Sequence, residues 1–435
     1  MEENRKRVVK NTLLLYVRMF LTMAIGLFTS RVVLNTLGVS DYGIYNVVGG
    51  IVTMLAFLNT GMVASSQRFL SYELGRSDLN RLKEVFGTSV TIHVVIALVI
   101  GCFAETIGLW FVNTHLNIDP DRMFAANCVY QASILTFMIS VISVPYNSCI
   151  VAHERMSAFA YVSILESVLK LLIVYLLWVL PWDKLVVYGV LVVGVSALIR
   201  WIYALYCKKH FEECTYAFHF DRRLFNEMSS FAGWSVVGNM GFSMRDQMSN
   251  IILNLFYGTT LNAARGIAMQ VSSVINTFST NFTMAINPQI TKQYASGHLG
   301  ESQQLVYAAA RYSFYLLMLI SIPVMLHVDY ILKLWLGIVP EYTGLFVNLT
   351  LLSALLYAVT QSVTVALQAT GRIKVFQIGI CLLMLSEIPM AYGLLAMGYS
   401  PYSVMYPTLL TNTIAIFFRF YLIKRMIPTY SVVYY

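Results

Sequence analysis

The chain has 435 residues, of which 58% are hydrophobic and only 11% are charged. A soluble protein of this length would need about 25% charged residues to cover its surface. The composition therefore excludes a soluble enzyme and a disordered chain. The formal net charge is +8, but no basic stripe on a polar face carries it, so nucleic acid is also excluded as a partner. An all-α integral membrane protein with many spans remains.

Twelve segments are long and apolar enough to cross a bilayer, which takes about 20 residues as a helix. The alternating pattern of a membrane β-barrel is absent. Short polar breaks separate the segments, such as GRSDLNRLK at 75–83 and TGRIK at 370–374. The predicted spans are 12–36, 42–70, 84–112, 122–150, 157–180, 185–207, 228–257, 261–290, 304–328, 342–369, 373–397 and 401–423.

One long polar connection divides the chain almost in half. We expect an N-terminal six-helix lobe at 1–207, an inter-lobe linker at 208–227 and a C-terminal six-helix lobe at 228–435. The halves also share short sequence features, because Leu34–Gly38 and Leu253–Gly258 both close the first span of a half. Six spans per half predict parallel repeats related by a pseudo-two-fold axis along the membrane normal, an arrangement typical of transporters.

Basic residues are distributed unevenly between the two sets of loops. The N-terminus and the loops on its side hold 17 lysines and arginines, whereas the opposite loops hold only Arg122, Lys184 and Lys333. Positive loops face the cytoplasm. We therefore expect both termini and the 208–227 linker to be cytoplasmic.

The spans themselves contain nine basic residues against four acidic ones. A charge at the bilayer centre costs about 2.5–3.5 kcal/mol on insertion scales, so such residues face a bundle interior or a water-filled cavity. Arg18, Arg31, Arg245 and Arg265 are the candidates for lining a cavity. Its positive surplus would attract an anion, and the planar guanidinium suits phosphate.

The acidic residues of the spans receive separate interpretations. Glu166 and Lys170 stand at i, i+4 with the acid first, which favours a structural ion pair. Glu105, Asp246 and Glu387 are candidates for ion coupling. Asp246 follows Arg245 directly, and side chains of neighbouring residues point about 100° apart on a helix, so the two are not expected to cancel.

No catalytic or metal-binding motif is found. There is no phosphate-binding P-loop, no GxSxG and no HExxH, so neither an enzyme nor a cofactor is predicted. The six cysteines form no CxxC pair, and no group of them has metal-ligand spacing. We expect them to be small packing residues, and we predict no metal site.

Several motifs resemble one family across essentially the whole chain. GLFTSR at 26–31, LGVSDYGIY at 37–45 and SSQRFLS at 65–71 look like the opening of polysaccharide flippases. NAARGIAMQV at 262–271 and NPQITKQY at 287–294 resemble bacterial oligosaccharide flippases of the multidrug/oligosaccharidyl-lipid/polysaccharide exporter superfamily. The resemblance implies a V-shaped transporter fold with two lobes. It also implies alternating access and a cationic cavity for an undecaprenyl-diphosphate-linked oligosaccharide.

The resemblance supports a flippase of the bacterial inner membrane that acts in capsule, O-antigen or lipopolysaccharide assembly. Its expected partners are the lipid-linked oligosaccharide, membrane lipids, a polysaccharide polymerase, glycosyltransferases, and H⁺ or Na⁺. Drug exporters of the superfamily often carry a carboxylate in the first helix, which is absent here. Lipid II flippases usually have two more helices, and this sequence ends at Tyr435 soon after its twelfth predicted span. A multidrug/cation antiporter, a lipid II flippase and a non-transporting scaffold remain the alternatives.

Overall fold

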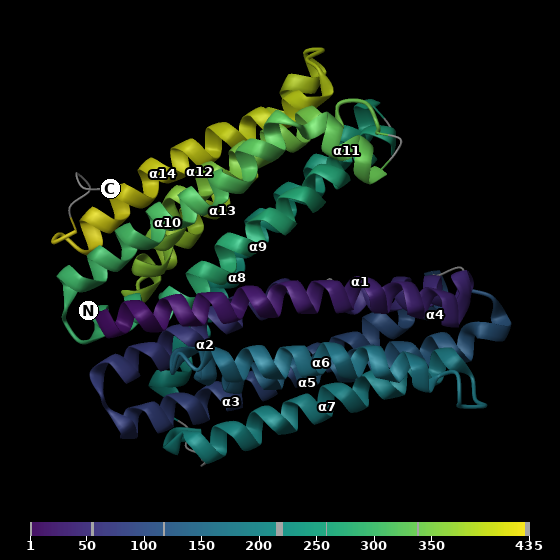
Figure 1. Cartoon of the computed structure of the whole chain (residues 1–435), viewed down its shortest axis with the longest axis horizontal. Helices are drawn as coiled ribbons and strands as arrows, with labels where there is room; N and C mark the ends of the chain where they lie inside the picture. Colours follow the sequence, from purple (N-terminus) through teal and green to yellow (C-terminus); the bar gives the residue numbers. More distant parts are fainter. Residues whose placement is uncertain are drawn as a thin grey trace. The chain divides into compact units, whose positions relative to one another are not determined.

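The computed structural model describes residues 2–53, 56–115, 118–214, 221–257, 259–336 and 339–430. Within these ranges the chain is helical and has no β-strand (Figure 1). It forms two compact units, Met1–Ala232 and Gly233–Tyr435. The boundary between them falls inside one long helix, α8. This architecture confirms the predicted all-α fold class.

Unit 1 is a bundle built around the long helix α5. Helix α5 packs against α2, α3 and α7, and α6 packs against both α1 and α7. The described elements of this unit are α1 Glu2–Thr53, α2 Ala56–Arg76, α3 Leu79–Phe103, a π-helical turn Ala104–Gly108, α4 Leu109–His115, a 3₁₀ turn Pro120–Arg122, α5 Met123–Ala152, α6 Met156–Leu176, α7 Lys184–His210 and a 3₁₀ turn Glu212–Cys214.

Unit 2 is a second bundle, in which α12 occupies the centre. Helix α12 packs against α9, α10 and α14, and α13 packs against α14 (Figure 1). The described elements are α8 Arg222–Tyr257, which begins in unit 1, then α9 Thr259–Ala295, α10 Leu299–Leu326, α11 Val328–Leu336, α12 Thr343–Ala369, α13 Lys374–Ala396, a 3₁₀ turn Pro401–Met405 and α14 Tyr406–Met426.

Where the structure describes them, all twelve predicted spans correspond to helical structure. The first two meet within α1, which is kinked at Gly38 (φ 82°, ψ 168°). By length and composition, seven helical segments of the described chain could cross a membrane: Leu79–Thr114, Pro120–Ala152, Met156–Leu176, Lys184–His210, Leu299–Leu326, Thr343–Ala369 and Lys374–Ala396. The other expected spans lie on α1, α2, α8, α9 and α14, which carry more polar and charged side chains.

The polar breaks end helices through identifiable local chemistry. The Asp78 carboxylate accepts from the Arg81 amide at 3.0 Å and caps the start of α3. The Asp183 carboxylate accepts from the amides of Leu185 and Val186 and caps α7. Gly371, in the TGRIK break after α12, has φ 77°, a conformation that suits glycine.

The core of each unit is apolar, and so is much of the outer surface. Tyr130 and Phe346 are fully buried in units 1 and 2 respectively. By contrast, Val190 is 62% exposed, Leu319 is 72% exposed and Phe417 is 70% exposed on helix surfaces. Large apolar side chains on helix surfaces indicate a lipid environment, because water would leave them unfavourably hydrated. The chain is a multi-pass membrane protein.

Arg122, which precedes α5, forms ion pairs with Asp41 near the α1 kink and with Asp183 at the start of α7. Its guanidinium donates to both oxygens of Asp41, at 3.0 and 2.5 Å, and to Asp183 at 2.5 Å. Burial alone would raise the pKa of the Asp183 carboxyl, but the Arg122 guanidinium and the capped amides outweigh burial and hold that pKa below its usual range. Two acids that are 142 residues apart in the sequence, Asp41 and Asp183, thus converge on one arginine.

Candidate functional site

Four charged residues of the expected spans meet inside unit 2. Arg245 on α8 donates to the Asp246 carboxylate at 3.0 Å, and its second nitrogen lies 3.8 Å from a carboxylate oxygen of Glu387 on α13. Arg265 on α9 lies 3.7 Å from the same Asp246 oxygen and donates to the Asp246 carbonyl at 3.3 Å. It also donates to the side-chain oxygen of Asn250. We call Arg245, Asp246, Arg265 and Glu387 the charge cluster.

Glycine lets α8 approach α13 at the charge cluster. A Cβ placed on Gly241 would lie 2.9 Å from the backbone Cα of Cys381, closer than real Cβ atoms come. Gly241 precedes Arg245 by one helical turn, and Cys381 stands on the helix that carries Glu387. The absence of a side chain at this position therefore brings the arginine within reach of the glutamate.

Glu387 is the most deeply enclosed member of the charge cluster. Its side chain is 2% exposed, and it accepts hydrogen bonds from the hydroxyls of Thr408 at 2.6 Å and Thr411 at 2.5 Å, both on α14. A buried carboxylate needs such partners, because an unsatisfied one carries a large desolvation penalty. The two hydroxyls and Arg245 hold it on three sides.

The two arginines of the charge cluster are balanced by two carboxylates. We expected Arg245 and Asp246 to diverge along the helix, and this was wrong. The arginine side chain is long enough to turn back and contact its neighbour's carboxylate. The formal charge of the charge cluster is therefore zero. The surplus of basic over acidic residues in the predicted spans does not come from this cluster. Asp246 is 35% exposed, against 13% for Arg245 and 5% for Arg265, so it forms the accessible side.

The other predicted anion-binding residues lie on α1 in unit 1. The Arg18 guanidinium carbon lies 4.8 Å from the centre of the Phe159 ring on α6, a cation–π contact that makes its partial burial less costly. Arg31 is also on α1, but its side chain lies outside the described residues.

The remaining candidate acids are separate from the charge cluster in sequence and in local surroundings. Glu105 lies in the π-helical turn of unit 1, is exposed and accepts from the Gln131 amide at 2.9 Å. Lys170 donates to Glu166 at 2.6 Å along one face of α6, in the geometry of a helical ion pair. The structure therefore brings together only Asp246 and Glu387 of the three coupling candidates.

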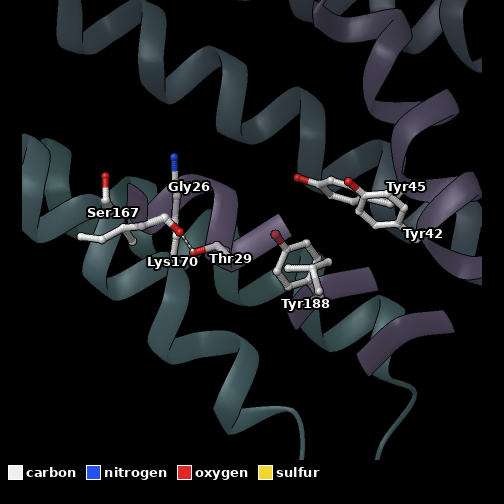
Figure 2. A pocket seen from close by; sticks show the side chains of 9 residues that line it. Gly26, Thr29, Tyr42, Tyr45, Ser167, Lys170 and Tyr188 are labelled. Carbon is white, nitrogen blue, oxygen red and sulfur yellow. Dashed lines mark hydrogen bonds between the residues drawn. The ribbon is translucent and has the colours of Figure 1, made fainter. Parts of the chain in front are cut away.

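Unit 1 contains a cavity of about 220 Å³ beside the α1 kink, which we call the tyrosine-lined cavity. Thr29 and Tyr42 line it from opposite sides of Gly38, Lys170 reaches it from α6, and Tyr188 reaches it from α7. Figure 2 shows Tyr42, Tyr45 and Tyr188 on one side of the cavity and Ser167 and Lys170 on the other. The rings of Tyr45 and Tyr188 make an edge-to-face contact at 5.1 Å. Such a mixture of aromatic rings, hydroxyls and one ammonium can bind a small polyol.

Sequence reasoning missed the residues that complete these sites. Thr408 and Thr411 resemble ordinary polar residues of a span, and only their spacing of three suggested a shared helix face. The tyrosines of the cavity come from two helices. Gly241 carries no chemical group at all, so its role depends wholly on the neighbouring backbone.

Comparisons with known proteins agree with this architecture. Residues 8–292 match the family described as polysaccharide biosynthesis protein. No curated protein sequence matches the chain. Among solved structures, a MATE in the straight conformation has a TM-score of 0.82 at 12% identity, and a MATE in the bent conformation has 0.82 at 13%. Each alignment covers 98% of this chain and 97% of the other.

A third structure extends the likeness. A MOP superfamily transporter from Pyrococcus furiosus, whose reversed pocket polarity suggests a different function for it, has a TM-score of 0.77 at 12% identity, covering 97% of this chain and 96% of that one. The chain therefore has the fold of the MATE transporters, a class of multi-pass membrane protein. By its sequence it belongs to the polysaccharide biosynthesis protein family.

Proposed function

We propose that this protein is a flippase that moves an undecaprenyl-diphosphate-linked oligosaccharide from the cytoplasmic to the periplasmic leaflet by alternating access. Membership of a polysaccharide biosynthesis family and a transporter fold support this proposal. The protein would reside in the bacterial inner membrane with both termini cytoplasmic. Its two transport lobes would be 1–207 and 228–435, joined by the linker 208–227, and a polymerase and glycosyltransferases would be its partners.

The observation that carries the proposal is the sharing of Asp246 by two arginines. Arg245 and Arg265 come from different helices and contact the same carboxylate oxygen at 2.9 and 3.7 Å. A diphosphate offers more acceptor oxygens and more charge than one carboxylate, so it would compete with Asp246 for both guanidiniums. Asp246 forms the accessible side of the charge cluster, so a diphosphate could reach the two guanidiniums by displacing its carboxylate.

Glu387 has a different part in this mechanism. It contacts Arg245 from the buried side and is held by two threonine hydroxyls. It would keep Arg245 in place while Asp246 is displaced by the anion. Arg18 and Arg31 are proposed as further diphosphate-binding residues, and the tyrosine-lined cavity of unit 1 would accept a sugar.

The first test compares transport by arginine variants in a strain that lacks the gene. Arg245→Ala and Arg265→Ala should accumulate lipid-linked oligosaccharide on the cytoplasmic leaflet and reduce surface polysaccharide at least about tenfold, since each charged hydrogen bond contributes about 1.5–3 kcal/mol. Arg311→Ala is the matched control, because Arg311 is an exposed arginine of α10 in the same unit. If the double variant Arg18→Ala/Arg245→Ala made the wild-type amount of surface polysaccharide at normal protein abundance, the assignment of these arginines to diphosphate binding would be contradicted.

The second test measures anion binding directly on the purified protein. Inorganic pyrophosphate should raise the thermal stability of the wild type. Asp246→Asn should bind pyrophosphate more tightly, because the amide keeps the shape of the carboxylate but no longer competes by charge. Arg265→Ala should abolish the effect. If Asp246→Asn weakened pyrophosphate binding, the carboxylate would not be the competitor, and this mechanism would fail.

Energy coupling is proposed to use H⁺ or Na⁺ at Asp246 and Glu387. These carboxylates also favour the second candidate function, a multidrug/cation antiporter, because acids within the spans can exchange a cation. Drug-resistance assays on overexpressing cells separate the two functions, since a flippase gives no efflux phenotype. Transport that ionophores leave unchanged would exclude ion coupling.

A further inference from the structure

Three cysteines, a histidine and a glutamate of unit 1 lie close together where α5 ends and the chain leaves α7. Cys149 is in the last turn of α5, and His153 follows this helix directly. Cys207 is in the last turn of α7, and Glu213 and Cys214 belong to the 3₁₀ turn after it. We call these five residues the cysteine cluster. They take no part in the charge cluster or the tyrosine-lined cavity.

The candidate ligand atoms of the cysteine cluster are close together. The sulfurs of Cys149 and Cys214 are 3.5 Å apart, and the Cys149 sulfur is 3.4 Å from a Glu213 oxygen. The imidazole Nε2 of His153 is 2.5 Å from that same oxygen. Ligand atoms of Cys149, His153 and Glu213 all lie within 4.8 Å of one another. The Cys207 thiol donates to the Tyr146 carbonyl at 3.5 Å and neighbours the thiols of Cys149 and Cys214.

These groups are enclosed rather than spread over a surface. Cys149 and Cys207 are fully buried, Glu213 is 2% exposed and Cys214 is 6% exposed. The His153 ring stacks on Phe211 with the centres 4.1 Å apart, which fixes its orientation. Three thiols would pack adequately as small apolar groups. The buried Glu213 carboxylate beside them has His153 as its partner, and this pair adds nitrogen and oxygen donors next to the sulfurs.

The spacing of the sulfurs fits a shared metal ion better than a disulfide. In a tetrahedral zinc site with zinc–sulfur bonds of about 2.3 Å, neighbouring sulfurs are about 3.8 Å apart. The 3.5 Å between Cys149 and Cys214 is close to that value and well beyond a covalent S–S bond of about 2.05 Å. Three sulfurs and a nitrogen or oxygen in one small volume are the donor set that zinc prefers over magnesium or calcium.

We propose that the cysteine cluster binds one zinc ion through the thiolates of Cys149, Cys207 and Cys214, with the fourth position taken from the His153–Glu213 pair. One member of the pair ligates the ion, and the other holds it by a hydrogen bond, as partners of metal ligands usually do. The metal joins the end of α5 to the turn that follows α7. It therefore holds the start of the linker 208–227 against the end of α5.

The experiment measures metal content in the purified full-length chain, prepared under reducing conditions with any histidine tag removed. Elemental analysis should find about one zinc per chain. Cys149→Ser and Cys214→Ser should lose the zinc. Cys102→Ser and Cys128→Ser are the matched controls, because these cysteines are exposed or half-buried outside the cluster and should leave the zinc content unchanged.

A second measurement keeps the proposal testable if the cluster variants do not fold. Wild-type protein exchanged with Co²⁺ should show the intense thiolate-to-cobalt absorption of a sulfur-rich tetrahedral site. Prior alkylation of the cysteines should abolish this absorption. Zinc well below one per chain, combined with no cobalt–thiolate absorption, would overturn the proposal. So would a Cys149–Cys214 disulfide found by mass spectrometry in the reduced preparation.

Discussion

The kink of α1 gives a prediction that isolates one physical effect. Gly38 has φ 82° and ψ 168°, a backbone region that essentially only glycine occupies. A Cβ added there would meet nothing within 4 Å, so steric contact plays no part. Gly38→Ala should therefore destabilise unit 1 by the backbone strain alone, which is about 1–3 kcal/mol.

The matched control is a glycine with the same open surroundings and ordinary helical geometry. Gly194 lies inside α7, has no atom within 4 Å of an added Cβ and does not have positive φ. Gly194→Ala should stabilise the protein by about 0.5–1 kcal/mol, because alanine loses less conformational freedom on folding. The two substitutions add the same methyl group and should have effects of opposite sign.

The assay is thermal unfolding of the purified protein in detergent. For a unit of this size, 1 kcal/mol corresponds to about 2–4 °C in Tm, so Gly38→Ala should unfold about 5 °C earlier and Gly194→Ala about 2 °C later. An unchanged or raised Tm for Gly38→Ala would refute the argument, because it would mean that α1 does not adopt the glycine-only conformation. The kink also separates Thr29 from Tyr42, so the same variant should disturb the tyrosine-lined cavity.

Three further outcomes are expected. Gly241→Ala should reduce transport and destabilise unit 2 by about 1–3 kcal/mol, because its Cβ meets the Cys381 backbone and pushes α8 from α13. Unaltered Tm and activity would speak against close packing there. Arg122→Ala should lower stability by about 1–2 kcal/mol and Arg122→Lys by less, since lysine keeps the charge without the fork. Equal losses of stability in Arg122→Ala and Arg122→Lys would contradict a role for the guanidinium fork that contacts both aspartates. Because the folded-state pKa of Asp183 is lowered, its stabilising contribution is complete above about pH 4 and is lost as pH falls through the folded-state value. Acid melting curves of wild type and Arg122→Ala should converge below that pH, and curves that stayed parallel would contradict this linkage.

The helical architecture could be predicted from the sequence for a physical reason. A bilayer offers no hydrogen bonds to the backbone, so each apolar run of sufficient length must form a helix. Polar breaks such as 75–83 and 370–374 then mark the helix ends, and Asp78 and Gly371 supply the local chemistry. The connection between the first two predicted spans was the exception. It forms no separate loop, because helical structure resumes directly after the kink at Gly38.

The membership of the candidate site could be predicted only in part. Arg245, Arg265 and Glu387 stand out in the sequence because charges in apolar spans are rare. Their mutual arrangement was not accessible, since helix periodicity fixes the direction of a Cβ but not the reach of a long arginine side chain. Periodicity predicted that Arg245 and Asp246 diverge, whereas the structure pairs them and makes the cluster neutral.

The cysteine cluster shows the same limit. Cys149 and His153 share one helix turn, but Cys207, Glu213 and Cys214 come from a region far along the chain. Local sequence therefore determined that this protein is a helical membrane protein, where its helices lie and which charges they carry. Only the tertiary structure decided which residues meet, because contacts between helices depend on how their surfaces pack and on where glycine allows close approach.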